Sequence, residues 1–383
     1  MDKVIPILTA NLFPLWMITA NLIARLGGMI ILLLIGHAFA PDILGSYFLI
    51  LAMVGLAVTA TQAGTGPLLV RLVQTGSTIK VILTVIVRLL IALVAIMLLA
   101  TRREFDATMH WPFLIMPVAA ALSPDWVISA RTEFPRLGLI TVIAQLAGIG
   151  MALLAVATNN NAILFAITPM ISVGAFIAAI CFAMRSQISR QSFIASQELG
   201  CKQTIGLIGF TLLAGFLPNL DFVLLGNGDD TLFLAQRVFL FCAGLITAIS
   251  ATLFAKQQSG LVREFWLFAP MICVTATLLI FPVQVAHLIY ATPDSGLISI
   301  LRSGAFWPLL LAVIARQCLV LQETGHAIWL GWLLLIALLA SSTLIPEPLE
   351  TFDVIMAAQM RLALISLILA GSQIWLVRKG AYP

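Results

Sequence analysis

Five arginines stand inside long apolar segments of the sequence, where a charged side chain is costly. They are Arg25, Arg88, Arg237, Arg302 and Arg361. A charge at the centre of a bilayer costs about 2.5–3.5 kcal/mol on insertion scales, so such a residue normally faces a partner or a cavity. Guanidinium groups bind phosphate oxygens through paired N–H donors. If several of these arginines face one cavity, its expected guest is a phosphate or pyrophosphate; scattered structural arginines are the alternative.

Two aspartates, Asp125 and Asp221, also lie inside apolar segments. Asp221 precedes the turn at Gly226 by five residues, and Arg237 lies six residues into the segment that follows. Neighbouring helices of one hairpin would hold the two groups at similar depth, which predicts a structural ion pair. Arg88 and Asp125 form a second predicted pair by the same reasoning. A titrating Asp221 that couples transport to a proton or sodium gradient is the alternative role.

Arg25 is the strongest candidate for contact with a ligand. It lies about thirteen residues from either end of its apolar segment, so its side chain cannot easily reach water. Arg302 and Arg361 lie six to eight residues from predicted outer loops, a distance that a long side chain partly covers by extending toward the interface. We expect Arg25 first, then Arg302 and Arg361, then Arg88 and Arg237, to line an anion-binding cavity.

The elements that must hold these residues are transmembrane helices. The 383 residues are 61% hydrophobic and 9% charged, with a mean hydropathy of +1.11, whereas soluble domains are about one quarter charged. Apolar runs long enough to cross about 30 Å of hydrocarbon recur along the chain. The predicted spans are 12–38, 44–70, 81–100, 110–129, 137–157, 162–184, 203–226, 231–255, 265–289, 296–315, 326–345 and 353–377. The fold class is therefore an all-α polytopic membrane protein with about twelve transmembrane helices.

The longest break between spans divides the chain into two sets of six helices. We predict an N-terminal six-helix lobe at 1–185, a cytoplasmic linker at 186–202 and a C-terminal six-helix lobe at 203–383. With both termini in the cytoplasm, the inner loops and helix ends carry thirteen basic residues, against two in the outer loops. This asymmetry satisfies the positive-inside rule. The inner residues are Lys3, Arg71, Lys80, Arg131, Arg136, Arg185, Arg190, Lys202, Lys256, Arg263, Arg316, Arg378 and Lys379; the outer ones are Arg102 and Arg103.

The short loops restrict the possible functions. None exceeds about twenty residues, which leaves no room for a soluble catalytic or nucleotide-binding domain, and the sequence has no phosphate-binding GxxxxGK[ST] loop. The five cysteines form no CxxC pair, and His287 and His326 lack ligand spacing. We therefore expect no metal, no cofactor and no enzymatic activity, and we expect function to reside among the helices.

The segment that follows Arg25 resembles the opening of the polysaccharide-transporter (O-antigen flippase) family. The matching elements are the early arginine, the short loop Pro41-Asp42, the Gly-x-Tyr of Gly45-Ser46-Tyr47, and Gly64 before Arg71. The seventh and eighth spans are similar to the second-half counterpart. That part carries Asn219, Asp221, Gly226 and Ala235-Gln236-Arg237, but it has Leu232-Phe233-Leu234 where Gly-x-Tyr would stand. Pro124-Asp125-Trp126 through Glu133 resembles the family's fourth span and the loop after it.

This resemblance implies the multidrug, oligosaccharidyl-lipid and polysaccharide exporter superfamily. The implied fold is two six-helix lobes around a central cavity that opens alternately to each side of the bacterial plasma (inner) membrane. The implied activity is movement of an undecaprenyl-pyrophosphate-linked oligosaccharide from the inner to the outer leaflet. Implied partners are the lipid-linked substrate, a coupling H⁺ or Na⁺, and a polymerase with its chain-length machinery.

Two other functions fit parts of the sequence. A cation-coupled multidrug exporter of the same architecture would need unpaired carboxylates in its cavity, but the spans hold two aspartates against five arginines. A polysaccharide polymerase or membrane glycosyltransferase would need a sizeable outer loop with catalytic groups, whereas the outer loops here span about five to ten residues. The arginine excess favours the flippase.

Overall fold

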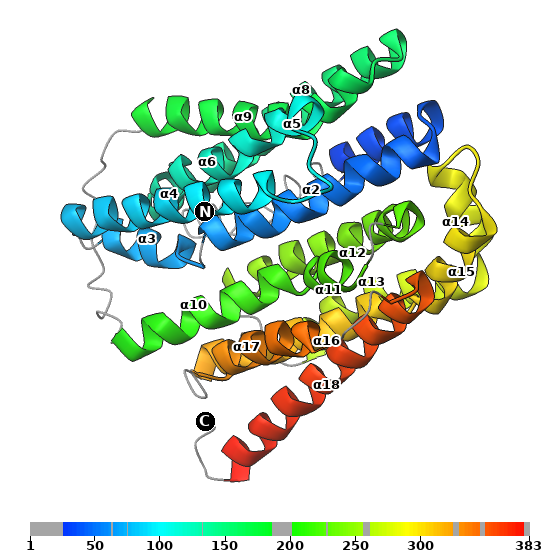
Figure 1. Ribbon diagram of the computed structural model, residues 1–383. Coiled ribbons are helices and arrows are strands. Elements are labelled where there is room, and N and C mark those ends of the chain that lie inside the picture. Colours follow the sequence, from blue (N-terminus) through cyan, green and yellow to red (C-terminus); the bar gives the residue numbers. More distant parts are fainter. Residues whose placement is uncertain are drawn as a thin grey trace, which may run out of the picture. The chain divides into compact units, whose positions relative to one another are not determined.

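The computed structural model is helical throughout the residues that it describes (Figure 1). These are residues 26–62, 64–74, 76–131, 133–185, 201–226, 229–255, 261–324, 329–344 and 349–378. Pairing of β type is limited in these ranges to one isolated bridge between Gly226 and Leu349. Nine helices of the described part are long and apolar enough to cross a membrane, and Leu26–Ala38 and Leu330–Thr343 are shorter apolar helices.

The chain forms two compact units. One comprises Met1–Ile35 with Ala57–Glu198, and the other Gly36–Leu56 with Leu199–Pro383. The boundary between the two units at Glu198 and Leu199 falls inside the predicted linker at 186–202. The units differ from the predicted lobes in residues 36–56, which are grouped with the second half of the chain. The predicted lobe boundaries therefore stay a prediction.

Helices in the first half of the chain follow the predicted spans, but two of these spans are interrupted in the structure. The predicted span 44–70 is divided into α2 and α3 near Gly64, whose φ of 61° lies in the left-handed region that glycine tolerates. The predicted span 110–129 consists of short pieces, since prolines near residues 112 and 124 withhold backbone donors. The elements are α2 Pro41–Gln62, α3 Gly66–Gln74, α4 Thr78–Ala100, α5 Ala107–His110, η1 Trp111–Leu114, α6 Ile115–Leu122, α7 Asp125–Ala130, α8 Phe134–Thr158 and α9 Asn161–Arg185.

The second unit is organised around α16, which contacts α10, α12, α13 and α18 (Figure 1). Its aromatic core consists of Phe222, Phe239 and Trp307, whose ring centroids lie 5.6–6.3 Å apart. These rings are buried, which makes them a large apolar contribution to the packing of α11, α12 and α16. The elements are α10 Cys201–Phe216, α11 Leu220–Leu225, α12 Asp230–Ala255, α13 Leu261–Ile280, α14 Pro282–Ile289, α15 Ser295–Ser303, α16 Trp307–Thr324, α17 Leu330–Thr343 and α18 Thr351–Arg378.

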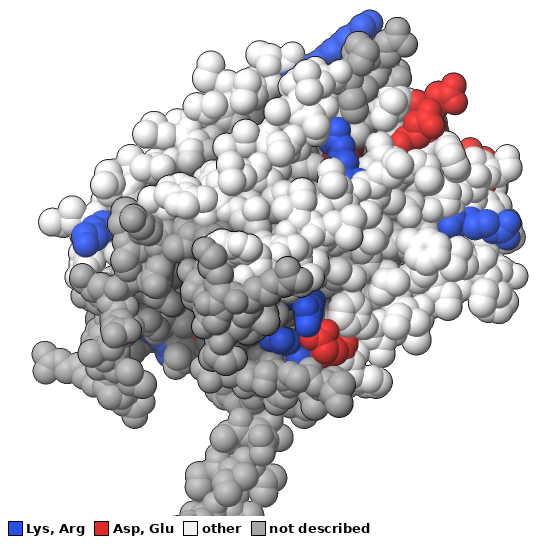
Figure 2. All heavy atoms as spheres, turned by 90° about the horizontal axis from the view of Figure 1, so that it is seen from below, with Lys and Arg blue, Asp and Glu red and all other residues white. Residues whose placement is uncertain are grey.

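The outer surface of both units is apolar. Large hydrophobic side chains are exposed along α4, where Met97 is 69% exposed, and along α18, where Leu367 is also 69% exposed. In the described part of the face that Figure 2 shows, charged side chains form a few small groups within uncharged surface. Such exposure would be a large cost in water and is the normal state of a helix that faces lipid.

Candidate functional site

The break between α10 and α11 places Asp221 in the interior of the second unit. The chain turns at residues 217–219, where Pro218 has no N–H to continue the helix. Asp221 is 4% exposed, and its Oδ1 accepts a hydrogen bond from Nη1 of Arg361 on α18 at 2.7 Å. The same Nη1 also donates to the hydroxyl of Ser342 on α17 at 2.8 Å. Three helices thus meet at this ion pair. The partner of Asp221 is Arg361 and not Arg237, which the sequence analysis predicted.

Two amide side chains form a hydrogen bond near this ion pair in the sequence, since one of them belongs to Asn219, two residues before Asp221. Gln236 of α12 donates from Nε2 to Oδ1 of Asn219 at 2.9 Å, and Asn219 is the residue at which α11 begins. Gln236 is fully buried, and its Oε1 has no hydrogen-bond partner. A buried acceptor without a hydrogen-bond donor costs about 1–3 kcal/mol of folding free energy. The Gln236 side chain therefore lowers the stability of the protein at this position.

Arg237, the residue after Gln236, is half-buried and packs against an aromatic residue of α2. Its guanidinium carbon lies 4.8 Å from the ring centroid of Phe48, and Nη2 donates to the Phe48 carbonyl at 3.3 Å. Its Nε has no hydrogen-bond partner. None of the residues that the structure describes supplies a carboxylate within 4.0 Å of Arg237. A positive charge is therefore held inside the second unit by a ring face and a carbonyl.

In the first unit, Arg88 lies at the break between α2 and α3. It is 4% exposed, and its Nε donates to the hydroxyl of Thr65 at 2.6 Å. That hydroxyl donates in turn to the carbonyl of Gln62 at 2.8 Å, so it links the guanidinium to the end of α2. Asp125, the predicted partner, interacts with Arg88 electrostatically, but the two groups do not come within the 4.0 Å of an ion pair.

Two further arginines were predicted to line the site, Arg25 and Arg302. Arg25, the first choice from sequence, lies outside the described residues. Arg302 is exposed in the last turn of α15. The structure therefore brings Arg361 and Asp221 together and places Arg88, Arg237 and Arg302 at three other positions.

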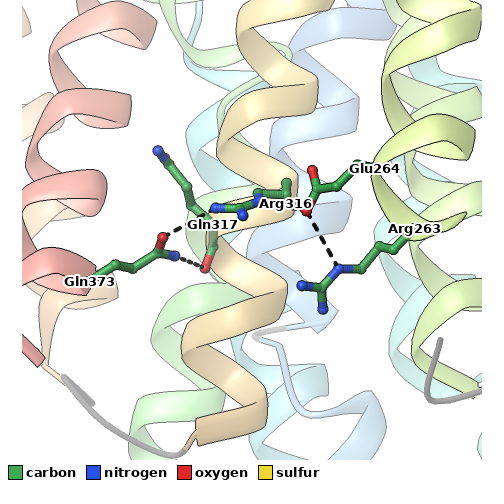
Figure 3. A network of polar contacts seen from close by, with 5 residues as sticks. All are labelled: Arg263, Glu264, Arg316, Gln317 and Gln373. Atoms are coloured by element: carbon green, nitrogen blue, oxygen red, sulfur yellow. Dashed lines mark hydrogen bonds and ion pairs between the residues drawn. The ribbon is translucent and has the colours of Figure 1, made fainter. Parts of the chain in front are cut away.

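A third polar cluster, which the sequence reasoning missed, joins α13, α16 and α18 (Figure 3). Arg316 donates from Nε to Oε1 of Glu264 at 3.0 Å and from Nη1 to Oε1 of Gln373 at 3.4 Å. Arg263 lies with its Nε 3.9 Å from the same Glu264 oxygen. Gln373 donates to the Gln317 carbonyl at 3.1 Å. We define these five residues, Arg263, Glu264, Arg316, Gln317 and Gln373, as the α13–α16–α18 cluster.

Both arginines of this cluster were counted at inner loops and helix ends. Arg263 is in the first turn of α13, which begins at Leu261, and Arg316 lies within α16, which continues to Thr324, past the predicted end of the span 296–315. The adjacent pair Arg316-Gln317 could have indicated this cluster from the sequence. Two strongly polar residues next to an apolar run are as compatible with a polar cluster inside the helix bundle as with a loop.

Each unit holds arginines and carboxylates at the sites described above. The first unit has Arg88 and Asp125, and the second has Arg237, Arg263, Arg316 and Arg361 with Asp221 and Glu264. Asp221 and Glu264 each accept a hydrogen bond from an arginine. In the part of the chain that the structure describes, no group of three or more His, Cys, Asp and Glu side chains could hold a metal ion.

Solved membrane transporters share this fold. No protein-family model and no curated protein matches the sequence. A multidrug resistance MATE family transporter of the MOP superfamily, in an inward-facing conformation, is 12% identical, with a TM-score of 0.57 over 95% of this chain and 98% of that one. A MOP superfamily transporter from Pyrococcus furiosus, described as having a binding pocket of reverse polarity that suggests a different function, is 14% identical, with a TM-score of 0.56 over 96% and 95%.

A MATE transporter from Vibrio cholerae is also similar, at 16% identity with a TM-score of 0.50 over 97% of both chains. These identities are low, and the likeness extends over nearly the whole length of each chain. The prediction of an all-α polytopic membrane protein with about twelve transmembrane helices in two lobes is confirmed. The chain has the fold of the MOP superfamily transporters.

Proposed function

We propose that this protein is a flippase for an anionic lipid-linked substrate, an undecaprenyl-pyrophosphate-linked oligosaccharide, which it moves from the inner to the outer leaflet by alternating access. The observation that carries the proposal is the half-buried guanidinium of Arg237, which has a ring face and a carbonyl as neighbours and no carboxylate of the described residues within ion-pair distance. A cation kept in this state attracts an anion more strongly than one that is already paired.

The charge balance supports an anionic substrate over a cationic one. A transporter of organic cations needs a carboxylate that is available to them, but Asp221 already accepts a hydrogen bond from Arg361 at 2.7 Å. A pyrophosphate loses its hydration when it crosses the low-dielectric core, and guanidinium donors are suited to replace it. The polyprenyl tail would remain in lipid while the charged group crosses.

The proposal includes a setting and partners. We place the protein in the bacterial inner membrane with both termini in the cytoplasm, from the distribution of basic residues in the sequence. It has no catalytic step of its own, works with a polymerase and chain-length machinery, and is coupled to H⁺ or Na⁺. The binding pocket of reverse polarity attributed to the Pyrococcus furiosus transporter is a precedent within this fold for a pocket of altered charge.

A cation-coupled multidrug exporter is the second candidate, and it is favoured by one observation. The multidrug resistance MATE transporter has the same fold over 98% of its length. The charge balance described above opposes this candidate. A deletion strain that gains sensitivity to organic cations while its surface polysaccharide is unchanged would favour the exporter.

The decisive experiment uses the full-length chain in vesicles that contain undecaprenyl-pyrophosphate-linked oligosaccharide in both leaflets. The rate at which the protein exposes inner-leaflet substrate to an added glycosidase is measured. We expect Arg237→Gln to reduce that rate at least tenfold and Arg237→Lys to retain part of it, because Lys keeps the charge and loses the paired donors.

Arg102→Gln is the control, because Arg102 is exposed in the loop after α4 and should leave the rate unchanged. Substrate movement that is equal for the wild type and for vesicles without protein would exclude the flippase. If movement is present but Arg237→Gln and Arg102→Gln behave alike, the role of Arg237 would be excluded and the transport activity kept.

A further inference from the structure

The hairpin that joins the helix Leu26–Ala38 to α2 is grouped with the second unit, although the chain on either side of it is grouped with the first. The second unit includes residues 36–56, so its limits fall inside both of these helices. The position of the hairpin therefore depends on its contacts with the second unit as well as on the helices that carry it. We define residues 36–48 as the strap.

Two glycines seat the strap against the second half of the chain. A Cβ at Gly36 would overlap the carbonyl oxygen of Ile289, and the Gly36 carbonyl accepts a hydrogen bond from the N–H of Ala291 at 3.3 Å. A Cβ at Gly45 would overlap the Cβ and the Oδ1 of Asp230. Glycine lets the backbone approach this closely, so the strap docks against the turn after α14 and against the start of α12.

Apolar side chains of the strap are buried in this docked arrangement. Phe39, Leu44 and Phe48 are all withdrawn from solvent. The Phe48 ring also lies 4.8 Å from the guanidinium carbon of Arg237, and the Phe48 carbonyl accepts a hydrogen bond from its Nη2 at 3.3 Å. Burial of apolar surface and a cation–π contact therefore stabilise the docked strap.

Carboxylates at the same contact oppose docking. The side chain of Asp230 lies against Gly45, and Asp42 lies three residues before Gly45, on the same side of α2. Asp42 and Asp229, in the turn before α12, both interact with Asp230 as like charges. None of the described lysines and arginines comes within 4.0 Å of these three carboxylates. The docked strap is thus held by apolar contacts against a repulsion between acids.

The other charged groups at this end of the second unit are mostly acidic. The hydroxyl of Thr351 donates to Asp229, which ties the turn before α12 to the start of α18. Arg237 lies two turns further along α12, about 10 Å from Asp230 along the helix axis. Like charges that share a site ionise in steps, because each charge opposes the next, so added protons reduce the repulsion at this contact. The remaining titratable groups at this end are His37, Asp294, Glu350 and Asp353.

We propose that the strap is a proton-responsive latch, which docks when a carboxylate of Asp42, Asp229 or Asp230 is protonated and undocks when all three are ionised. A fall in pH at this end of the unit therefore favours the docked strap. Undocking opens the close contacts at the two glycines and separates the Phe48 ring from Arg237. The latch does not depend on the transported substrate. Its use as the H⁺-dependent step of alternating access rests on the function proposed above.

The test measures the distance between the strap and the turn after α14 in the full-length chain, without substrate. Spin labels are attached at Ala38→Cys and Ala291→Cys in lipid nanodiscs, in a variant that lacks the five native cysteines. Both positions are exposed, and the hydrogen bond from Ala291 to Gly36 places them close together when the strap is docked. Electron paramagnetic resonance is recorded at about pH 4.5, near the usual Asp pKa of about 3.9, and at about pH 7.5.

We expect the short-distance fraction to fall about two- to threefold from the lower to the higher pH, the effect of like charges near a surface. Asp230→Asn should remove this response and keep the strap docked at both pH values. Asp353→Asn is the matched control, because it removes an exposed carboxylate at the start of α18 and should leave the response intact. Gly45→Ala should lower the docked fraction at both pH values, since its methyl group would overlap Asp230.

Equal short-distance fractions at the two pH values, in the labelled protein without further substitution, would overturn the latch. A full pH response in Asp230→Asn, or an equal loss of response in Asp353→Asn, would overturn it as well. Asp42→Asn replaces Asp230→Asn if the latter does not fold, because Asp42 is exposed, and it should reduce the response by about half. Because no substrate is present, failure of the latch leaves the flippase proposal standing, and the glycosidase assay tests that proposal separately.

Discussion

The carboxylate of Asp221 and the guanidinium of Arg361 join residues 140 positions apart in the sequence, at 2.7 Å. The pair connects α11, the short helix that follows the break at residues 217–219, to α18, the last helix of the chain. Both side chains are largely withdrawn from solvent, with exposed fractions of 5% and 14%. The pair is therefore an interaction whose loss leaves a charge without compensation.

Removal of both partners should destabilise the protein less than the sum of the two single removals. We expect Asp221→Asn and Arg361→Gln each to cost about 3 kcal/mol, because the remaining group is left buried and unpaired. The double variant should cost about 1–3 kcal/mol less than the sum of the two. Chemical unfolding of the purified chain in detergent measures this cycle. Arg302→Gln, at an exposed position of α15, should change stability by less than about 0.5 kcal/mol. Strictly additive costs would contradict the pairing.

Gly45, one of the residues in the family resemblance, permits close approach of α2 to the first residue of α12. A Cβ at Gly45 would lie 2.2 Å from the Cβ of Asp230 and 2.5 Å from its Cα. Gly45→Ala should therefore destabilise the second unit by about 1–3 kcal/mol through overpacking. Gly371→Ala on α18 is the control, because nothing lies within 4 Å of the added methyl, and helix propensity should stabilise it by up to about 1 kcal/mol. Unchanged thermal stability in Gly45→Ala would show that the two helices can separate at little cost.

Phe48 should contribute to stability through a cation–π contact with the guanidinium of Arg237. With the guanidinium of Arg237 at 4.8 Å from its ring centroid and the site buried, Phe48→Leu should lose about 2 kcal/mol from the cation–π contact. Phe352→Leu is the comparison, since Phe352 is 50% exposed on α18. Thermal unfolding in detergent measures both variants. A loss in Phe48→Leu no larger than that in Phe352→Leu would mean that ring and guanidinium do not interact appreciably.

Helix positions followed from the sequence because apolar length and turn residues determine them locally. The predicted span 231–255 is α12 at Asp230–Ala255, and the predicted span 353–377 is α18 at Thr351–Arg378. Each of these helices begins beside a polar turn, where the backbone can leave the hydrocarbon. The break at Gly64 was missed because the residues around it remain apolar enough to continue a span.

The partners of charged residues did not follow from the sequence, because they depend on which helices are neighbours. Asp221 and Arg237 belong to consecutive helices at similar depth, and from this we predicted an ion pair between them. The prediction was wrong, because Asp221 is paired with Arg361. The contacts of α11 with α18, and not the order of the chain, bring Arg361 to Asp221. Arg316 was assigned to a loop because a charge was taken as the end of a span, whereas Glu264 and Gln373 satisfy it inside the bundle.

The hydroxyl of Thr65 should stabilise the break between α2 and α3 by accepting a hydrogen bond from Arg88. Thr65 is 8% exposed and Arg88 is 4% exposed, and Nε of Arg88 lies 2.6 Å from the hydroxyl oxygen. Thr65→Val keeps the shape and removes the acceptor, so it should cost about 1–3 kcal/mol for the charged donor left buried. Thr65→Ser keeps the acceptor and should lose less than half of that amount.

Thr84→Val on α4 is the matched control for this substitution. Its hydroxyl donates only to the carbonyl of Lys80 at an exposed position, 2.8 Å away, so its loss should change stability by less than about 0.5 kcal/mol. Chemical unfolding of the four proteins in one detergent compares them directly. If Thr65→Val and Thr84→Val are equally stable, Arg88 must be satisfied by another group, and Asp125, which interacts with it electrostatically, would then be the residue to replace next.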